Sequence, residues 1–272
     1  MASQNNHPSV ILNVEGLEKR FGGITALTDY SVNIRRGELV GLIGPNGAGK
    51  TTVFNLLSGV LKPSDGRIYF NDRDITRLRP DQNTALGIAR TFQNIRLFKE
   101  LSVRDNIKVA FHMHLGRGFW KTLFHTSEYR QAEIEMRHRA HEMMELFGLV
   151  SVEDIPAKNL PYGIQRRVEI ARAMATLPKL LLLDEPSAGL NPSETEELVK
   201  ILQDLHRKNN LTIFLVEHDM KLIMAVCQKI QVIDRGRMLT MGTPDDVRQD
   251  LRVIEAYLGK SGRGNLGDEN HA

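Results

Sequence analysis

The residues best suited to chemistry form a glycine-rich stretch between two apolar segments. This stretch consists of Gly44, Pro45, Asn46, Gly47, Ala48, Gly49, Lys50, Thr51 and Thr52. Its spacing fits G-x-x-x-x-G-K-[ST], a pattern that gathers backbone N–H groups around phosphates at the N-terminus of a helix. We expect Lys50 to reach the β- and γ-phosphates of a nucleoside triphosphate, and the Thr51 hydroxyl to ligate Mg²⁺. The stretch therefore predicts a phosphate-binding loop (P-loop) between a strand and a helix.

Two acidic residues follow a second apolar run, residues 180–183. A buried strand of this kind ends at the carboxyl edge of its sheet, where α/β folds place their sites. Asp184 suits a direct or water-mediated contact with Mg²⁺, and Glu185 suits a general base that polarises an attacking water. Acids after an apolar strand are often only a solvated strand end. In the same chain as a P-loop, they favour a catalytic reading.

Length and composition favour a soluble globular protein with one large domain, or a domain and a subdomain. Of the 272 residues, 41% are hydrophobic and 25% charged, which is ordinary for folded proteins. The net charge of +3 is too small to indicate a nucleic-acid partner, and we expect none. The single cysteine, Cys227, excludes an internal disulfide, and its apolar neighbours favour a buried structural thiol.

The two ends of the chain carry little structural signal. Residues 1–9 are polar and predict a disordered N-terminus, with no charged segment followed by an apolar one that would indicate a signal peptide. Residues 260–272 are polar and glycine-rich, which predicts a flexible tail. No apolar run approaches the roughly 20 residues that span a bilayer.

Hydrophobic periodicity outlines an α/β protein. The patterns predict strands at 11–17, 26–34, 39–43, 67–70, 179–183 and 211–216, a hairpin over 230–241, a strand-like piece ending at Gln93, and helices at 127–147, 159–176, from 191 onward and at 245–258. Two strands precede the strand of the P-loop. An antiparallel β segment is therefore expected before the nucleotide-binding core.

Over residues 10–245 the sequence resembles the ATPase subunit of ABC transporters. The resemblance rests on the P-loop, Thr91-Phe92-Gln93-Asn94, a signature region at residues 160–165, the acidic strand end at 181–186, a D-loop at 187–191 and His218, all in the family's order and spacing. It implies a P-loop NTPase (RecA-like) core with an antiparallel β subdomain. It also implies a helical subdomain at about 90–165, within an ATPase domain spanning residues 10–259.

The resemblance assigns roles to further residues. Phe21 is expected to stack on adenine, and His218 to hydrogen-bond the γ-phosphate or the attacking water. Gln93 is expected to sense the γ-phosphate and water, to help ligate Mg²⁺ and to contact the membrane subunit. The alternatives are a core phenylalanine, a helix-capping histidine and a surface glutamine. The family works as a head-to-tail dimer, so each ATP would lie between one P-loop and the Gly163 region of a second ATPase.

The signature region departs from the usual Leu-Ser-Gly-Gly-Gln. Pro161 replaces the serine, Tyr162 the first glycine and Ile164 the glutamine, whereas Gly163 is kept. The missing hydroxyl removes one hydrogen bond to a charged group, worth roughly 1.5–3 kcal/mol at most. Asn191 stands where the D-loop commonly ends in aspartate, a smaller change.

These departures point to one branch of the family. The Tyr-Gly signature followed by residues 165–172, an aromatic and basic insertion at 112–126 and the ending at 253–259 resemble ATPases of branched-chain (hydrophobic) amino-acid importers. Such importers imply membrane permeases, a periplasmic binding protein and a peripheral location on the cytoplasmic face of the inner membrane. The alternatives are a lipopolysaccharide-export ATPase, a soluble ABC ATPase without transport, and a non-hydrolysing regulatory subunit. Lys50, Asp184, Glu185 and His218 argue against the last.

The insertion at 112–126 allows two interpretations. Its aromatic side chains, including Phe119, Trp120 and Phe124, either dock the permease or the inner leaflet or pack on the helix at 127–147. Its histidines are not accompanied by cysteine or acidic residues at ligand spacing, which disfavours a metal site.

Glu185 is tested directly by Glu185→Gln. If Glu185 is the general base, we expect the substitution to abolish ATP turnover while trapping an ATP-bound dimer, because binding does not require proton transfer. Undiminished hydrolysis would remove Glu185 from this role.

Overall fold

The computed structural model describes residues 9–115 and 127–258, which form two compact units. The first unit contains residues up to Arg77 and from Val216 onward, and the second contains Leu78–Leu215. The disorder expected at 1–9, the insertion at 112–126 and the tail at 260–272 lie wholly or mostly outside the described residues, although 112–115 belong to the end of a helix. Within the described ranges, no helix is both long and apolar enough to cross a bilayer.

The first unit begins with the expected antiparallel sheet. Its order is β2-β1-β4-β5, with β1 at Val10–Phe21, β2 at Ile24–Arg35, β4 at Asp65–Phe70 and β5 at Arg73–Asp74. Strands β1 and β2 are longer than predicted. Their pairing contains several register shifts. Such bulges interrupt the alternation of apolar and polar residues from which a strand is recognised.

The same unit holds the strand of the P-loop. Strand β3 (Leu39–Ile43) pairs in parallel with β9 (Lys229–Asp234), and β9 pairs antiparallel with β10 (Arg237–Gly242). The β9–β10 hairpin is confirmed, with both turn residues, Arg235 and Gly236, at positive φ. The buried Tyr30 hydroxyl lies 2.5 Å from Gln231 Oε1 and so connects β2 to β9.

Helices α8 (Met220–Val226), α9 (Pro244–Gln249) and α10 (Leu251–Leu258) complete the first unit. The single helix predicted at 245–258 is wrong, because Asp250 adopts an extended conformation between α9 and α10. Its carboxylate accepts hydrogen bonds from the Arg252 backbone and guanidinium, an Asx-type turn that competes with helix. Cys227, just after α8, is buried as expected, and burial raises the pKa of its thiol.

The second unit contains β6 (Ile88–Arg90), β7 (Leu180–Asp184) and most of β8 (Thr212–Val216), with α2 at Pro80–Leu86. Strands β6 and β7 are parallel, with Ile88 opposite Leu180 and Arg90 opposite Leu182. Every residue of β7 and β8 is buried, which explains their unbroken apolar sequences.

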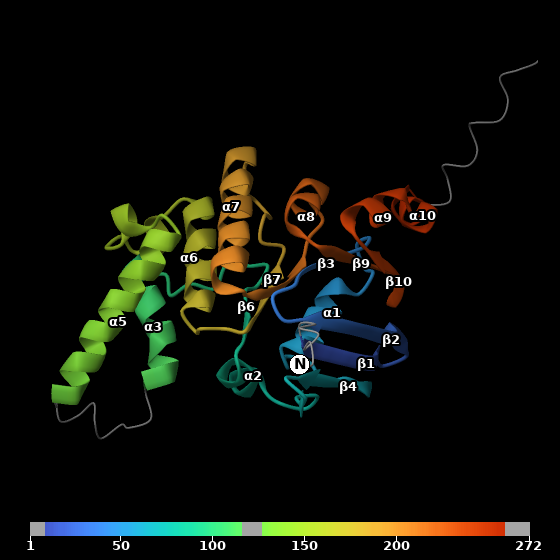
Figure 1. The fold of residues 1–272 in the computed structure, drawn as a ribbon, viewed down its shortest axis with the longest axis horizontal. Helices are drawn as coiled ribbons and strands as arrows, with labels where there is room; N and C mark the ends of the chain where they lie inside the picture. The colour runs from blue at the N-terminus through green and yellow to red at the C-terminus, as the bar shows by residue number, and fades with distance from the viewer. Residues whose placement is uncertain (1–8, 116–126, 259–272) are drawn as a thin grey trace, which may run out of the picture. The chain divides into compact units, whose positions relative to one another are not determined.

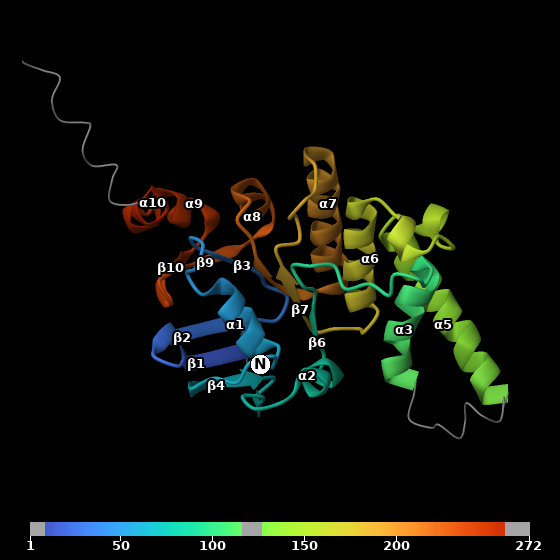
Figure 2. The same cartoon turned by 180° about the vertical axis from the view of Figure 1, so that it is seen from behind.

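Helices make up the rest of the second unit. They are α3 (Val103–Leu115), α5 (Ser127–Leu146), α6 (Tyr162–Met174) and α7 (Pro192–Asn209). Figures 1 and 2 both show α3 beside α5 and α6 beside α7. Helix α5 buries Met136, Ala140 and Met144, and Phe147 just after the helix is also buried.

The start of α6 differs from the prediction. The helix begins at Tyr162 rather than Asn159, because a short 3₁₀ turn at Ala157–Asn159 and an extended Leu160 precede it. The start of α7 is as expected. Asn191 and Glu194 form a capping box, with Pro192 at the first helical position.

Candidate active site

The glycines of the P-loop are required by close packing in the first unit. A Cβ on Gly44 would lie 2.1 Å from the Ile233 carbonyl oxygen of β9, and one on Gly49 would lie 3.0 Å from the Ala26 oxygen. Gly49 also has a φ of 106°, which side chains disfavour. At Gly47 an added Cβ would meet nothing within 4 Å. The loop is therefore packed against β9 and the Ala26 backbone at Gly44 and Gly49, and it has free space at Gly47.

Lys50 curls back over this loop. Its Nζ donates to the carbonyl oxygens of Gly44 at 2.6 Å and Pro45 at 3.0 Å, and the side chain is buried. Helix α1 (Lys50–Leu57) has Gly49 as N-cap and no side-chain cap among the residues described. The backbone N–H groups of its first turn, together with an ammonium and the exposed Thr51 hydroxyl, suit an anion.

A cavity of about 470 Å³ borders the P-loop within the first unit. It is lined by Pro45, Asn46, Gly47, Ala48, Asp234, Arg235, Leu239, Arg252, Glu255 and Ala256. Helix α10 thus lies against the loop, and partial burial raises the pKa of the Tyr257 hydroxyl. This contact is not predictable from local sequence patterns, because α10 is distant from the P-loop in the chain.

His218 follows the end of β8 in the same unit. The Glu217 N–H donates to the Leu42 carbonyl, two residues before Gly44, and the buried Glu217 carboxylate accepts from the His218 N–H at 3.1 Å. The His218 side chain is 59% exposed. The alternative of a helix-capping histidine is wrong, because Asp219 caps α8 through the N–H groups of Lys221 and Leu222.

Phe21 ends β1 and is 46% exposed. The Lys19 ammonium lies 5.1 Å from the centre of its ring, a cation–π distance. Exposure excludes the alternative of a core phenylalanine. Stacking on adenine remains a prediction.

Asp184 is held by a buried ion pair in the second unit. Arg90, at the end of β6, donates to Asp184 Oδ2 at 2.8 Å, and both side chains are nearly inaccessible. Burial lowers the pKa of the Arg90 guanidinium despite this hydrogen bond. The Thr91 hydroxyl also accepts from the Asp184 N–H at 3.4 Å. The carboxylate is therefore oriented by residues of the neighbouring strand end.

Gln93 and Glu185 meet directly. The Gln93 amide Nε2 donates to Glu185 Oε2 at 2.7 Å, so the two strand ends bring together residues far apart in the chain. Glu185 has a φ of 46°, the left-handed conformation. For a residue other than glycine this costs on the order of 1–2 kcal/mol and is typical of functional positions.

Helix α6 fixes the main chain around Gln93. The fully buried Arg166 donates to the Phe92 and Gln93 carbonyl oxygens, each at 2.8 Å, and to Glu169 at 2.8 Å. Burial raises the pKa of Glu169 although Arg166 lies beside it. The Arg166–Glu169 pair was not predicted from the sequence. The sequence feature that could have indicated it is the placement of two opposite charges three residues apart in the predicted helix.

Gly163 is buried near the start of α6. A Cβ there would lie 2.2 Å from Glu194 Oε1, and Glu194 is held in the capping box of α7. Packing alone therefore requires glycine at this position. Its expected contact with nucleotide stays a prediction.

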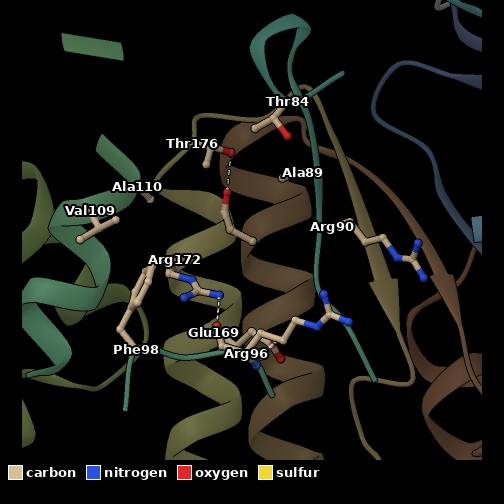
Figure 3. Close-up of a pocket in the computed structure, with 11 residues that line it drawn as sticks. Thr84, Ala89, Arg90, Arg96, Phe98, Val109, Ala110, Glu169, Arg172 and Thr176 are labelled. Atoms are coloured by element: carbon tan, nitrogen blue, oxygen red, sulfur yellow. Dashed lines mark hydrogen bonds between the residues drawn. The ribbon is translucent and has the colours of Figure 1, made fainter. Parts of the chain in front are cut away.

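A second cavity, of about 380 Å³, opens beside the segment that follows Gln93 (Figure 3). It is lined by Thr84, Ala89, Arg90, Arg96, Phe98, Val109, Ala110, Glu169, Arg172, Ala173 and Thr176. Arg172 donates to the Arg96 carbonyl oxygen, and its guanidinium lies 5.5 Å from the Phe98 ring centre. The lining thus combines exposed apolar groups with arginines.

The predicted site residues fall into two sets. The first unit holds Phe21, the P-loop and His218, and the second holds Gln93, Gly163, Asp184 and Glu185. The described residues contain no group of three or more His, Cys, Asp or Glu that could hold a metal ion. Thr51, Gln93 and Asp184 each carry an oxygen donor of the kind that Mg²⁺ takes, and the magnesium site expected from them stays a prediction.

Comparison with known proteins decides the family. The model of the ABC transporter family matches residues 27–188, more than half of the chain. The chain belongs to the ABC transporter ATPases. A second model, described as a branched-chain amino acid ATP-binding cassette transporter, matches residues 237–262, which include β10, α9 and α10.

Relatives and solved structures agree with this ABC ATPase assignment. The chain is 46% identical over 251 residues to the high-affinity branched-chain amino acid transport ATP-binding protein LivG of Escherichia coli K12, covering 92% of this chain and 98% of that protein. It is 34% identical to the E. coli lipopolysaccharide export ATP-binding protein LptB, covering 93% and 98%. The ADP conformation of the cassette MJ1267 has a TM-score of 0.79 at 31% identity, covering 93% of this chain and all of that one.

The Arg90–Asp184 pair can be tested through stability. Arg90→Met would leave the buried Asp184 carboxylate without its guanidinium, and we expect the free energy of unfolding to fall by roughly 3–5 kcal/mol. Adding Asp184→Asn should recover most of that loss. Urea denaturation measures both changes.

The matched control is Arg79→Met, which removes an exposed pair with Asp81 and should change the free energy of unfolding far less, because solvent screens the pair. Equal losses for Arg90→Met and Arg79→Met would contradict a buried structural pair.

Proposed function

We propose that this ABC ATPase powers an importer of branched-chain or other hydrophobic amino acids. The observation that carries the mechanism is the hydrogen bond between Gln93 and Glu185, beside the Arg90–Asp184 pair. It joins a candidate base to the segment that borders the cavity beyond Gln93. The cargo is supported by the model match at residues 237–262 and by the names of the relatives LivG and BraF, which are 44–47% identical.

Nucleotide binding begins with the phosphates. The backbone N–H groups of the P-loop surround them, Lys50 exchanges its carbonyl partners for β- and γ-phosphate oxygens, and Phe21 stacks on adenine. Thr51, Asp184 and the Gln93 amide oxygen would hold Mg²⁺, which would neutralise phosphate charge. Because Arg90 donates to Asp184 Oδ2, Oδ1 would be the oxygen available to the ion or to its water.

Hydrolysis is an in-line displacement at the γ-phosphorus. Glu185 takes a proton from water as the water oxygen bonds to the γ-phosphorus, and the bond to the bridging oxygen breaks to give ADP and phosphate. Gln93 orients Glu185 and the water. His218 donates to the γ-phosphate or to the same water.

A second ATPase completes each site. The solved cassette MJ0796 is dimeric in structures with a TM-score of 0.73 to this chain at 26% identity. In the proposed dimer, the start of α6 at Tyr162 and Gly163 meets the ATP of the partner's P-loop. The backbone N–H groups there replace the absent signature serine.

The cavity beyond Gln93 is the proposed contact with the permease. Phe98 and Val109 are 51% and 38% exposed at its edge, and Arg96 and Arg172 line it. This combination suits a cytoplasmic helix of the permease with apolar and acidic side chains. The chain would then bind peripherally to the cytoplasmic face of the inner membrane, and a periplasmic binding protein would deliver the cargo.

Two alternatives are less well supported. A lipopolysaccharide-export ATPase is favoured by the similarity to LptB, but the identity of 34% is lower than the 46% to LivG. The alternative of a soluble ABC ATPase without transport does not account for the cavity lined by apolar groups and arginines.

Transport by a reconstituted system tests this proposal. We expect proteoliposomes containing this chain and the membrane subunits encoded beside it to take up leucine with enclosed ATP, and Lys50→Ala to abolish uptake because the γ-phosphate loses its cation. Lys221→Ala, on the exposed side of α8, is the control and should leave uptake unchanged.

Other outcomes identify the alternatives. Release of lipopolysaccharide without leucine uptake would indicate the export type. ATP turnover that does not respond to any membrane subunit would indicate a soluble ATPase.

A further inference from the structure

The residue that replaces the first signature glycine makes two specific contacts. Tyr162 is the first residue of α6, and its hydroxyl accepts a hydrogen bond from the Arg166 guanidinium at 3.2 Å. Its ring lies against the loop after β7, because a Cβ on Gly189 would be 2.9 Å from Cε1 of the tyrosine. One side chain therefore touches both the 187–190 loop and Arg166.

Arg166 carries this connection onward. Two of its nitrogens hold the carbonyl oxygens of Phe92 and Gln93, and the Gln93 side chain donates to Glu185. All of these residues lie in the second unit. A continuous chain of contacts runs from Gly189 through Tyr162, Arg166 and Gln93 to Glu185.

The chemistry of Arg166 suits this role. Its planar guanidinium bridges two successive carbonyl oxygens, with Nη1 donating to Phe92 and Nη2 to Gln93, and Nη1 also donates to the Glu169 carboxylate. The Arg166 side chain is fully buried, and its bond to Glu169 is buried, whereas its bonds to the two carbonyls and to Tyr162 are partly buried. A displacement of Tyr162 would therefore either move the Gln93 backbone through Arg166 or break one of these hydrogen bonds.

We propose that Tyr162 and Arg166 are positioning residues that set the orientation of Gln93, and through it Glu185, according to how the Tyr162 ring sits on Gly189. This inference rests on the proposed ATPase cycle and adds a connection between the start of α6 and the base in the same chain. The tyrosine in the altered signature thereby has a positioning function.

Two neighbouring arginines of α6 provide a matched test. Arg166→Lys keeps the charge but cannot bridge both carbonyls, and we expect kcat for ATP to fall about tenfold with KM changed less than about twofold. Arg167→Lys alters a partly exposed pair with Glu197 and should leave both constants unchanged. Tyr162→Phe keeps the ring, removes the hydroxyl and should lower kcat about threefold, again at constant KM.

A double substitution separates positioning from general damage. In a Gln93→Ala background, Arg166→Lys should add less than about a twofold further loss, because the group it positions is gone. Steady-state kinetics and nucleotide affinity of the reconstituted transporter supply the readouts, and Tyr162→Phe serves if Arg166→Lys fails to fold.

Three results would overturn the inference. They are equal kinetics for Arg166→Lys and Arg167→Lys, a full tenfold loss persisting in the Gln93→Ala background, or unchanged kcat in Tyr162→Phe. A different result, the absence of ATP turnover in the wild-type transporter, would overturn the proposed function on which the inference rests.

Discussion

The parallel pairing of β6 with β7 determines where the reactive groups of the second unit meet. Arg90 lies opposite Leu182, so the chain beyond each strand emerges at the same edge of the sheet. Arg90 then reaches Asp184, and Gln93 reaches Glu185. A slip of one residue would turn these side chains to opposite faces, so the fully buried β7 also protects the register on which the chemistry depends.

The segment after β6 is held from two directions. On one side Gln93 donates to the Glu185 carboxylate, and on the other the carbonyl oxygens of Phe92 and Gln93 accept from Arg166 of α6. Beyond it lies the cavity with Phe98 and Arg172. A segment placed between a candidate base and a candidate docking surface is suited to pass a change in nucleotide state to a partner, because its hydrogen bonds to Glu185 and Arg166 connect it to both sides.

Much of this arrangement was predictable from local sequence patterns. The P-loop, the apolar strand ending in Asp184 and Glu185, and the hairpin around Arg235 were all recognised because backbone and burial rules act over a few residues. Contacts between segments that are distant in the chain were not predictable in this way. The Arg90–Asp184 and Arg166–Gln93 contacts join residues from separate elements, and no spacing rule reports which buried arginine will face which carbonyl. Helix 245–258 was misjudged because one aspartate, Asp250, forms a local turn that periodicity does not detect.

Hydrogen exchange in the reconstituted transporter tests most directly whether the segment after Gln93 transmits nucleotide state. With Glu185→Gln to prevent turnover, ATP in place of ADP should slow exchange of amides at 92–98 together with those at 162–166, by about fivefold or more. Amides of β9 and β10 serve as the internal reference. The account would be contradicted if ATP protected the P-loop at 44–52 while residues 92–98 exchanged as they do with ADP.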